Sequence, residues 1–460
     1  MSVDTQTQVK NAASQLSVGY VSFGRATFDI EAANQLSAES REVLKRQPNQ
    51  WHFIDSLVVD PQSAEAAAQQ LSGKIDVLLC QFTTFVDARY IDILASELKV
   101  PCILWAIREP NQKFGERLSL NSLTGANAAG QRLRNMGIPF RLVYGNADEP
   151  SFEDSLQVAL RFWAAWRKLQ QFHVITLGDA PEGFFFSQPS ASVCRQLGID
   201  ITHLDLNDTF QRAASVSETV SDVEIEQIKQ QVRAIEHLPP ESVKKFAQMI
   251  SVLKAELHQL KADAVAVRCW PEFFTEFGAA ACSTISALTD TGIMGSCEAD
   301  VLGSLSMDVL YQLTGSPAYL GDLVEVREEE GAVVFWHCGA GAFSLARNDT
   351  GAVAGKHPNR EIGFTLEFGL KPGRISLLRI GEDQGGQVRA LIGSGEVLDV
   401  PQRFRGTSAC VRLDGDADVA KRVVNVMEAG FEPHYAFAYG DAVEELARVL
   451  TLMKIPVTRF

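Results

Sequence analysis

The sequence predicts an α/β protein with two doubly wound open-sheet domains, followed by a smaller antiparallel β-barrel-like domain at its C-terminal end. The chain has 460 residues, more than one hydrophobic core usually serves, so several domains are expected. Strand-like and helix-like segments alternate in two successive series, and short strand-like segments with glycine-rich turns follow them. These observations place the domains at 1–170, 171–330 and 331–460.

The first domain alternates apolar strands with helices, a pattern typical of a parallel sheet. Its last helix is amphipathic and begins with a Ser-x-x-Asp capping pattern at Ser151. We expect strands at 16–24, 52–59, 75–82 and 101–107, and helices at 29–47, 62–72, 87–98 and 151–170.

The second domain repeats this alternation. Ligands of open parallel sheets bind beyond the carboxyl ends of the strands, which directs attention to the loops 22–29, 104–110 and 268–273. We expect strands at 172–179, 199–206 and 262–270, and helices at 191–198 and 218–260.

The third domain is expected to be an antiparallel, barrel-like structure, because short strands are separated by glycine-rich turns after residue 331. The expected strands are 332–339, 362–368, 373–380, 387–398 and 408–413, and the expected helices are 416–429 and 440–453.

The composition restricts the partners and the location. Fifty-seven acidic and 42 basic residues give a net charge of −15, which disfavours binding to nucleic acid and to anionic membranes. Residues 1–15 lack the pattern of a secretory signal, and no apolar run approaches about 18 residues. The eight cysteines are scattered singly, which indicates reduced thiols. We therefore expect a cytoplasmic protein.

The segment 292–315 carries the densest chemical signal, because Glu298 and Asp300 lie at the start of an amphipathic helix. Carboxylates at this position often only cap the helix. Asp322 and His337, however, each border an apolar segment, and His434 lies within an aromatic run, so these polar groups need partners. Two carboxylates and an imidazole suit Mn²⁺, Mg²⁺ or Co²⁺ in a catalytic site.

Nucleotide-dependent chemistry is not expected from this sequence. It contains neither a GxxxxGK[ST] phosphate loop nor a strand-anchored GxGxxG. The glycine clusters GAGAF and GSGE lie in the strand-rich C-terminal region and are interpreted as turns.

Several motifs along most of the chain look like those of the L-fucose isomerase-like family: GRATFD, RCWPEF, SCEADVLGSLSM with Asp322 after it, WHCG and PHYAFAYGD. The resemblance implies one Mn²⁺, with Mg²⁺ or Co²⁺ as alternatives, bound by Glu298, Asp322 and His434. Two carboxyls near one cation differ in proton affinity, so Glu298 and Asp322 are expected to be the catalytic pair, one as general base and the other as general acid, with the order left open. His337 is then either a fourth ligand or a substrate contact, and we expect a contact.

The resemblance further implies an aldose–ketose isomerase that works through an enediol, on a five- or six-carbon sugar such as L-fucose, D-arabinose or the sulfonated sugar sulfoquinovose. A metal-dependent epimerase or aldolase and a non-catalytic sugar-binding protein remain alternatives. A homo-oligomer, a trimer or hexamer with sites near subunit interfaces, is implied as well.

Further side chains are candidates for substrate contact, each with a plainer alternative. Arginines in loops are often only solvated, tryptophans often only pack in the core, and Asp300 is either a helix cap or a partner of the site. An anionic substrate requires a cation, for which Arg25, Arg108 and Lys356 are available. The candidate substrate-binding residues are Arg25, Trp105, Glu109, Asn121, Trp270 and His337.

Overall fold

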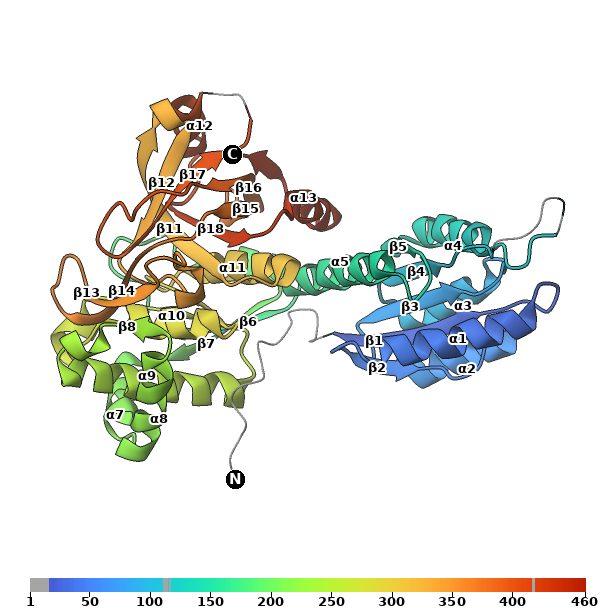
Figure 1. Cartoon of the computed structure of the whole chain (residues 1–460), viewed down its shortest axis with the longest axis horizontal. Helices are drawn as coiled ribbons and strands as arrows, with labels where there is room; N and C mark the ends of the chain where they lie inside the picture. Colours follow the sequence, from blue (N-terminus) through green and yellow to red (C-terminus); the bar gives the residue numbers. More distant parts are fainter. Residues whose placement is uncertain (1–15, 111–114, 116, 416–417) are drawn as a thin grey trace. The chain divides into compact units, whose positions relative to one another are not determined.

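Figure 1 shows the computed structural model of the chain, which describes residues 16–110, 115, 117–415 and 418–460. The chain forms two compact units: the N-terminal unit ends at Ala164, and the C-terminal unit comprises Ala165–Phe460. The division into three domains at 170 and 330 stays a prediction, and the absence of a signal in residues 1–15 concerns a segment outside the described residues.

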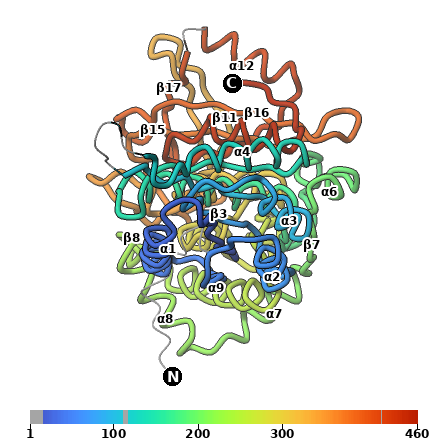
Figure 2. The backbone as a smooth tube through the Cα atoms, turned by 90° about the vertical axis from the view of Figure 1, so that its right-hand side faces the viewer, coloured from blue at the N-terminus to red at the C-terminus, as the bar shows by residue number. Residues whose placement is uncertain are grey.

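The N-terminal unit contains a five-stranded parallel sheet. In spatial order its strands are β2 (Gln50–Phe53), β1 (Ser17–Phe23), β3 (Val77–Phe82), β4 (Cys102–Ala106) and β5 (Phe140–Tyr144). Its helices are α1 (Ile30–Leu44), α2 (Pro61–Leu71), α3 (Arg89–Leu98) and α4 (Ser122–Met136), and α5 (Pro150–Lys168) continues past its boundary. Strands β3 and β4 are apolar and buried along their whole length, as central parallel strands are, and α1 to α4 surround β3 in Figure 2.

Two details of this unit differ from the sequence prediction. The strand expected at 52–59 ends at Phe53, and only Val58 beyond it pairs, through an isolated bridge to Phe23. Helix α4 and strand β5 were not expected. The buried face of α4 consists of alanine, glycine and serine with one leucine, so its sequence lacks the large apolar residues that mark an amphipathic helix.

The C-terminal unit begins with a four-stranded parallel sheet. In spatial order its strands are β10 (Met294–Ser296), β9 (Ala264–Val267), β6 (Phe172–Leu177) and β7 (Ile199–Leu204). Its helices are α6 (Ala191–Leu197), α7 (Leu206–Ala214), α8 (Glu218–Lys229), α9 (Pro240–Leu260), α10 (Cys282–Asp290) and α11 (Val301–Thr314). The helix expected over 218–260 is therefore two helices, separated by residues 230–239, which include the short strand β8 (Val232–Arg233). Helix α9 begins at Pro240, because proline is tolerated at the first helical position and not in a helix interior.

A closed antiparallel barrel of six strands follows, because β16 pairs with β17 as well as with β15. Around the barrel the strands are β16 (Val388–Val397), β15 (Gly373–Glu382), β18 (His434–Tyr439), β11 (Ala318–Arg327), β12 (Ala332–His337) and β17 (Thr407–Leu413). The predicted fold class is confirmed. Strands β13 (Ala352–Lys356), β14 (Gly363–Gly369) and β19 (Val457–Arg459) extend the sheet, and α12 (Val419–Glu428) and α13 (Val443–Leu452) complete the unit. Residues 416–417 of the helix expected at 416–429 lie outside the described residues.

Helix α11 connects the parallel sheet with the barrel. Every residue from Val301 to Leu313 is buried, and the helix packs against β9 and β10 as well as against β11, β15 and β18. A helix that is buried all round lies in the core rather than on a surface. Its N-terminus therefore meets both sheets. Over the described part of the chain, no helix is both long and apolar enough to cross a membrane.

Candidate active site

Glu298 lies in the short connection between β10 and α11. Glu298 and Ala299 both have a left-handed backbone, with φ values of 52° and 55°, which residues other than glycine rarely adopt. The backbone N–H of Ala299 donates to the carbonyl of Val267 at the end of β9, at 3.0 Å. This turn directs the Glu298 side chain into the protein, where the residue is 8% exposed. Strained backbone of this kind is typical of functional sites.

Asp322 and His434 come together because their strands pair. In the antiparallel register of β11 and β18, Asp322 lies directly opposite His434. On the other side of β11, Asp322 lies opposite Trp336 of β12, and His337 follows at the end of that strand. Residues directly opposite in an antiparallel pair have adjacent side chains. The barrel register therefore gathers these side chains at one place.

The imidazole of His434 is the centre of the cluster. Its Nε2 lies 3.5 Å from Oε2 of Glu298 and 3.6 Å from Oδ1 of Asp322. Nε2 of His337 lies 3.6 Å from the same Oε2 of Glu298. Ligand atoms of Glu298, His337 and His434 lie within 4.8 Å of one another, and Asp322 joins this group through His434.

Asp300 links this cluster to the buried core. Its carboxylate caps α11 by accepting the backbone N–H of Gly303 at 2.8 Å, and it also accepts a hydrogen bond from Nδ1 of His434 at 2.8 Å. The guanidinium of Arg379, fully buried, donates to the two carboxylate oxygens at 2.6 and 3.2 Å. Burial would raise the pKa of Asp300, but Arg379 and His434 outweigh it and lower that pKa to about 2. Asp300 is thus both a helix cap and a partner of the site.

This arrangement suits a divalent cation. Because Nδ1 of His434 donates to an ionised carboxylate, Nε2 is the ring nitrogen left to bind a cation, and it faces the carboxylates of Glu298 and Asp322. Such a hydrogen bond from a carboxylate orients metal-binding histidines in many proteins. Oε2 of Glu298 is buried and has no hydrogen-bond partner among the residues that the structure describes. Two carboxylates and one imidazole nitrogen that converge match the donor set that Mn²⁺ or Mg²⁺ prefers.

His337 is arranged differently from His434. Its Nδ1 accepts the backbone N–H of Cys338 at 3.0 Å, so a proton resides on Nε2, the atom that faces Glu298. Burial would lower the pKa of His337, but Cys338 and Glu298 outweigh burial and raise it well above the usual value. Burial would likewise raise the pKa of Glu298, but His337 and His434 lower it. His337 is therefore suited to donate a hydrogen bond, and Glu298 to remain a carboxylate.

A cavity of about 190 Å³ opens onto these groups. Its aromatic walls can pack against the C–H face of a sugar. Burial, together with the neighbouring His337 and Arg360, lowers the pKa of His357 in this wall to about 4, so this imidazole is neutral at neutral pH. The lining residues are Trp270, Phe274, Glu298, Asp322, Trp336, His337, Cys338, His357, Asn359 and Arg360.

Four of the predicted substrate contacts belong to the N-terminal unit, and two of these have structural roles there. Trp105 is fully buried, and its indole N–H donates to the carbonyl of Gly145 at 2.8 Å. The carboxylate of Glu109 accepts the backbone N–H of Asn121 at 2.8 Å and so holds the start of α4. We do not carry Trp105 or Glu109 into the proposed site.

The other two have partners within their own unit. Asn121 accepts a hydrogen bond from the hydroxyl of Thr124 at 2.7 Å. The guanidinium of Arg25 lies 5.9 Å from the ring centroid of Phe85. Substrate contacts by Asn121 and Arg25 stay predictions.

Sequence reasoning missed the part of the cavity wall contributed by Phe274, His357, Asn359 and Arg360. Three of these residues belong to the segment HPNR, which has the composition of an ordinary polar turn. Its only signal is a histidine and an arginine three positions apart. Arg379, which holds Asp300, was missed because it lies within an apolar strand.

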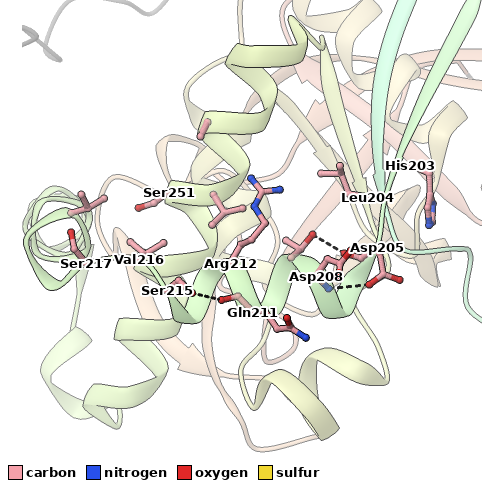
Figure 3. A pocket seen from close by; sticks show the side chains of 14 residues that line it. His203, Leu204, Asp205, Asp208, Gln211, Arg212, Ser215, Val216, Ser217 and Ser251 are labelled. Carbon is pink, nitrogen blue, oxygen red and sulfur yellow. Dashed lines mark hydrogen bonds between the residues drawn. The ribbon is translucent and has the colours of Figure 1, made fainter.

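A larger cavity of about 1060 Å³ lies elsewhere in the C-terminal unit, beside α7, α8 and α9 (Figure 3). Its polar side chains serve helix ends: Asp205 accepts the backbone N–H of Asp208 at 2.9 Å, and Ser215 donates to the carbonyl of Gln211 at 2.9 Å. Among the described residues, none of the side-chain groups close enough to share a cation borders this cavity. The smaller cavity is therefore the better candidate for the site.

Known proteins are similar to this chain over most of its length. Residues 19–169 match the family model described as fucose/sulfoquinovose isomerase, N-terminal domain, and residues 340–460 match the one described as L-fucose isomerase, C-terminal domain. The chain is 39% identical over 444 residues to the sulfoquinovose isomerase of Alkalicoccus urumqiensis, covering 96% of this chain and 99% of the relative. It is 40% identical over 439 residues to the sulfoquinovose isomerase of Priestia aryabhattai, covering 94% and 97%, and 33% identical over 450 residues to that of Clostridium sp. (strain MSTE9), covering 96% and 98%. The chain therefore belongs to the fucose/sulfoquinovose isomerase family and is an aldose–ketose isomerase.

Proposed function

We propose that this chain interconverts sulfoquinovose and the corresponding 2-ketose by moving the carbonyl group between C1 and C2. The curated relatives named as sulfoquinovose isomerases cover almost the whole chain, which supports this substrate. The observation that carries the chemistry is the convergence of Glu298, Asp322 and His434 beside a cavity with aromatic walls.

We further propose that Glu298, Asp322 and His434 hold one divalent cation, Mn²⁺ in the first place and Mg²⁺ or Co²⁺ as alternatives. The hydrogen bond from His434 to Asp300 and the unpartnered Oε2 of Glu298 support this assignment. When bound, such a cation stabilises the negative charge that develops on the sugar oxygens as the enediolate forms.

The side chains of the site perform the proton transfers in this proposal. The lowered pKa of Glu298 keeps its carboxylate ionised, which a proton acceptor requires, and we assign to it the proton of the carbon next to the carbonyl. The side chain of Asp322 is 35% exposed and borders the cavity, so it is placed to exchange protons with the sugar oxygens. His337 donates a hydrogen bond to an oxygen of the substrate.

The test is isomerisation in deuterated water. The protein is stripped with a chelator, supplied with Mn²⁺ and given sulfoquinovose, and deuterium at C1 or C2 is measured by NMR. We expect exchange and ketose formation only with the cation, and their loss in Glu298→Gln. Glu325→Gln is the matched control, because Glu325 forms an exposed ion pair with Arg403 away from the cavity.

Each outcome has a definite meaning. A product epimerised at C2, or cleaved, would replace the isomerase chemistry by the epimerase or aldolase alternative. If neutral aldoses are converted and sulfoquinovose is not, the substrate assignment is overturned. Binding of sugar with no exchange in any condition would favour a binding protein.

We also propose that the chain forms a homo-oligomer. Phe185 is 91% exposed, while its neighbour Phe186 packs edge-on against His434 at 5.1 Å, so an apolar side chain is presented beside the site. Light scattering on the eluting protein measures the mass, and a monomer of 50.4 kDa would contradict this proposal. The trimer or hexamer and the cytoplasmic location stay predictions.

A further inference from the structure

The turn between β13 and β14 places the positively charged side chain of Arg360 in the wall of the cavity. Residues 357–361 connect β13 and β14, and the backbone N–H of Arg360 donates to the carbonyl of His357 at 3.2 Å. The backbone N–H of Asn359 donates to Nδ1 of His357 at 3.3 Å. The proton of the neutral His357 ring is therefore on Nε2, which is left as a donor.

Cys338 lies between this turn and the cluster of Glu298, His337 and His434. Nδ1 of His337 lies 3.3 Å from the sulfur of Cys338, and that sulfur lies within 4.8 Å of a ring nitrogen of His357. The ring of Phe274 packs on His357 at 4.9 Å, and the guanidinium of Arg360 lies 6.0 Å from the centroid of the Phe274 ring. Stacking on an aromatic ring holds a guanidinium in place.

Arg360 is free to bind an anion. The neighbouring arginines are paired: Arg403 with Glu325 at 2.8 Å, and Arg405 with Glu361 at 2.7 Å. Within the described parts of the chain, no carboxylate lies within ion-pair distance of Arg360, although Glu361 follows it directly. Among the described residues that line the cavity, Arg360 is also the only lysine or arginine.

We propose that Arg360, together with Nε2–H of His357 and the side-chain amide of Asn359, binds the sulfonate group on C6 of the substrate and makes the enzyme prefer a sulfonated aldose. This inference rests on the proposed function. A sulfonate offers three acceptor oxygens and carries its charge at all working pH values. The planar fork of donors of a guanidinium matches two such oxygens at once.

The test compares sulfoquinovose with 6-deoxy-D-glucose, which has the same carbon chain with hydrogen in place of the sulfonate. The ratio of their kcat/KM values is measured for the wild type and for Arg360→Gln. We expect the ratio to fall on the order of 10- to 100-fold, mostly through a higher KM for sulfoquinovose, because hydrogen bonds to charged groups have this strength. Arg360→Lys should restore part of the ratio.

The control variant is Arg403→Gln, which removes a nearby arginine whose charge is already paired with Glu325. We expect it to leave the ratio unchanged. Thermal unfolding of all variants checks that they are folded.

Binding is measured separately from turnover, by calorimetry with sulfoquinovose. If the wild type binds and Arg360→Gln binds at least about 10-fold more weakly, the inference holds even if no ketose forms, and only the proposed function fails. If Arg360→Gln keeps the wild-type ratio and the wild-type affinity, the inference is overturned while the proposed function stands. If the wild type has the higher kcat/KM for 6-deoxy-D-glucose and does not bind sulfoquinovose in the calorimeter, both are overturned.

Discussion

Asp300 shows how one residue can serve the stability and the chemistry of this enzyme together. It caps α11, pairs with the buried Arg379 and orients His434. Substitution by alanine would leave Arg379 buried beside only Glu432, whose Oε2 is 3.7 Å away. An uncompensated buried charge is strongly destabilising.

We therefore expect Asp300→Ala to lower the free energy of unfolding by about 3 kcal/mol or more and to weaken Mn²⁺ binding. Urea unfolding and cation titration measure the two effects. Asp399→Ala is the control, because Asp399 pairs with Arg347 while being 71% exposed, and its loss should change the free energy of unfolding by less than about 1 kcal/mol. Equal effects of the two substitutions would contradict the role of Asp300.

The two histidines of the site should respond differently to substitution. His434 presents a lone pair to the carboxylates, whereas His337 presents a proton. Loss of a residue that only supports a metal ligand lowers metal affinity by roughly 10- to 100-fold. We expect His434→Asn, which removes a ligand itself, to lower Mn²⁺ affinity by more than this. His337→Asn should keep the affinity and lower kcat on the order of 100-fold. Electron paramagnetic resonance of free Mn²⁺ gives the affinity, and loss of binding in His337→Asn would identify His337 as a ligand.

At the scale of elements, the buried helix α11 contains a carboxylate whose ionisation opposes folding. Burial raises the pKa of Asp308 to about 6, although Lys168, 3.9 Å away, lowers it. In the unfolded chain this pKa is the ordinary 3.8, so between the two values the folded state binds more protons than the unfolded state. The contribution of Asp308 to stability is therefore largest below pH 4 and is lost as the pH rises through 6.

We expect this group to lower the free energy of unfolding by on the order of 3 kcal/mol between pH 4 and pH 6, since one pKa unit corresponds to about 1.4 kcal/mol. Asp308→Asn should remove this fall, and the difference between variant and wild type should grow with pH up to about 6 and then stay constant. Urea unfolding over this pH range measures it. A constant difference at every pH would show that Asp308 titrates normally.

Helices and strands with large apolar side chains were easier to predict from the sequence than those with small buried side chains. The apolar strands β3 and β4 and the alternation of strands and helices are plain in the sequence, because burial on both faces requires continuous apolar runs. Helix α4 was missed because alanine, glycine and serine cover most of its buried face. The extent of the helical region after Glu218 was wrong because α8 ends at Lys229 and the chain forms β8 before α9 begins at Pro240.

The residues of the candidate site could be predicted from sequence motifs, but the contacts that depend on strand pairing could not. Glu298, Asp322 and His434 stand out as polar residues at the borders of apolar segments. That Asp322 faces His434 depends on the register of β11 and β18, which the sequence does not display. Arg360 lies in a turn that resembles any solvated loop, and its unpaired charge is visible only beside the pairs made by its neighbours.

At the scale of the whole molecule, the cation should join parts of the chain that are far apart in sequence. Glu298 precedes α11, Asp322 is on β11 and His434 is on β18. A cation present at about 100 times its dissociation constant stabilises the folded state by about 2.7 kcal/mol. We expect Mn²⁺ to increase protection from hydrogen exchange in these three segments and to leave β3 and β4 of the N-terminal unit unchanged. Mass spectrometry of the exchanged peptides measures this, and equal protection in β3 would contradict a local site.

The position of α11 has a consequence for recombination between relatives. Glu298 stands on the connection from the parallel sheet, while Asp322 and His434 are on barrel strands, and the buried α11 packs against both sheets. A crossover between Gly315 and Ala318 would take Glu298 from one parent and its two partners from another, and it would pack α11 of one parent against the barrel strands of the other. Chimeras joined there should be poorer catalysts than chimeras joined at α5, and the halves of this enzyme are expected to have been inherited as one piece.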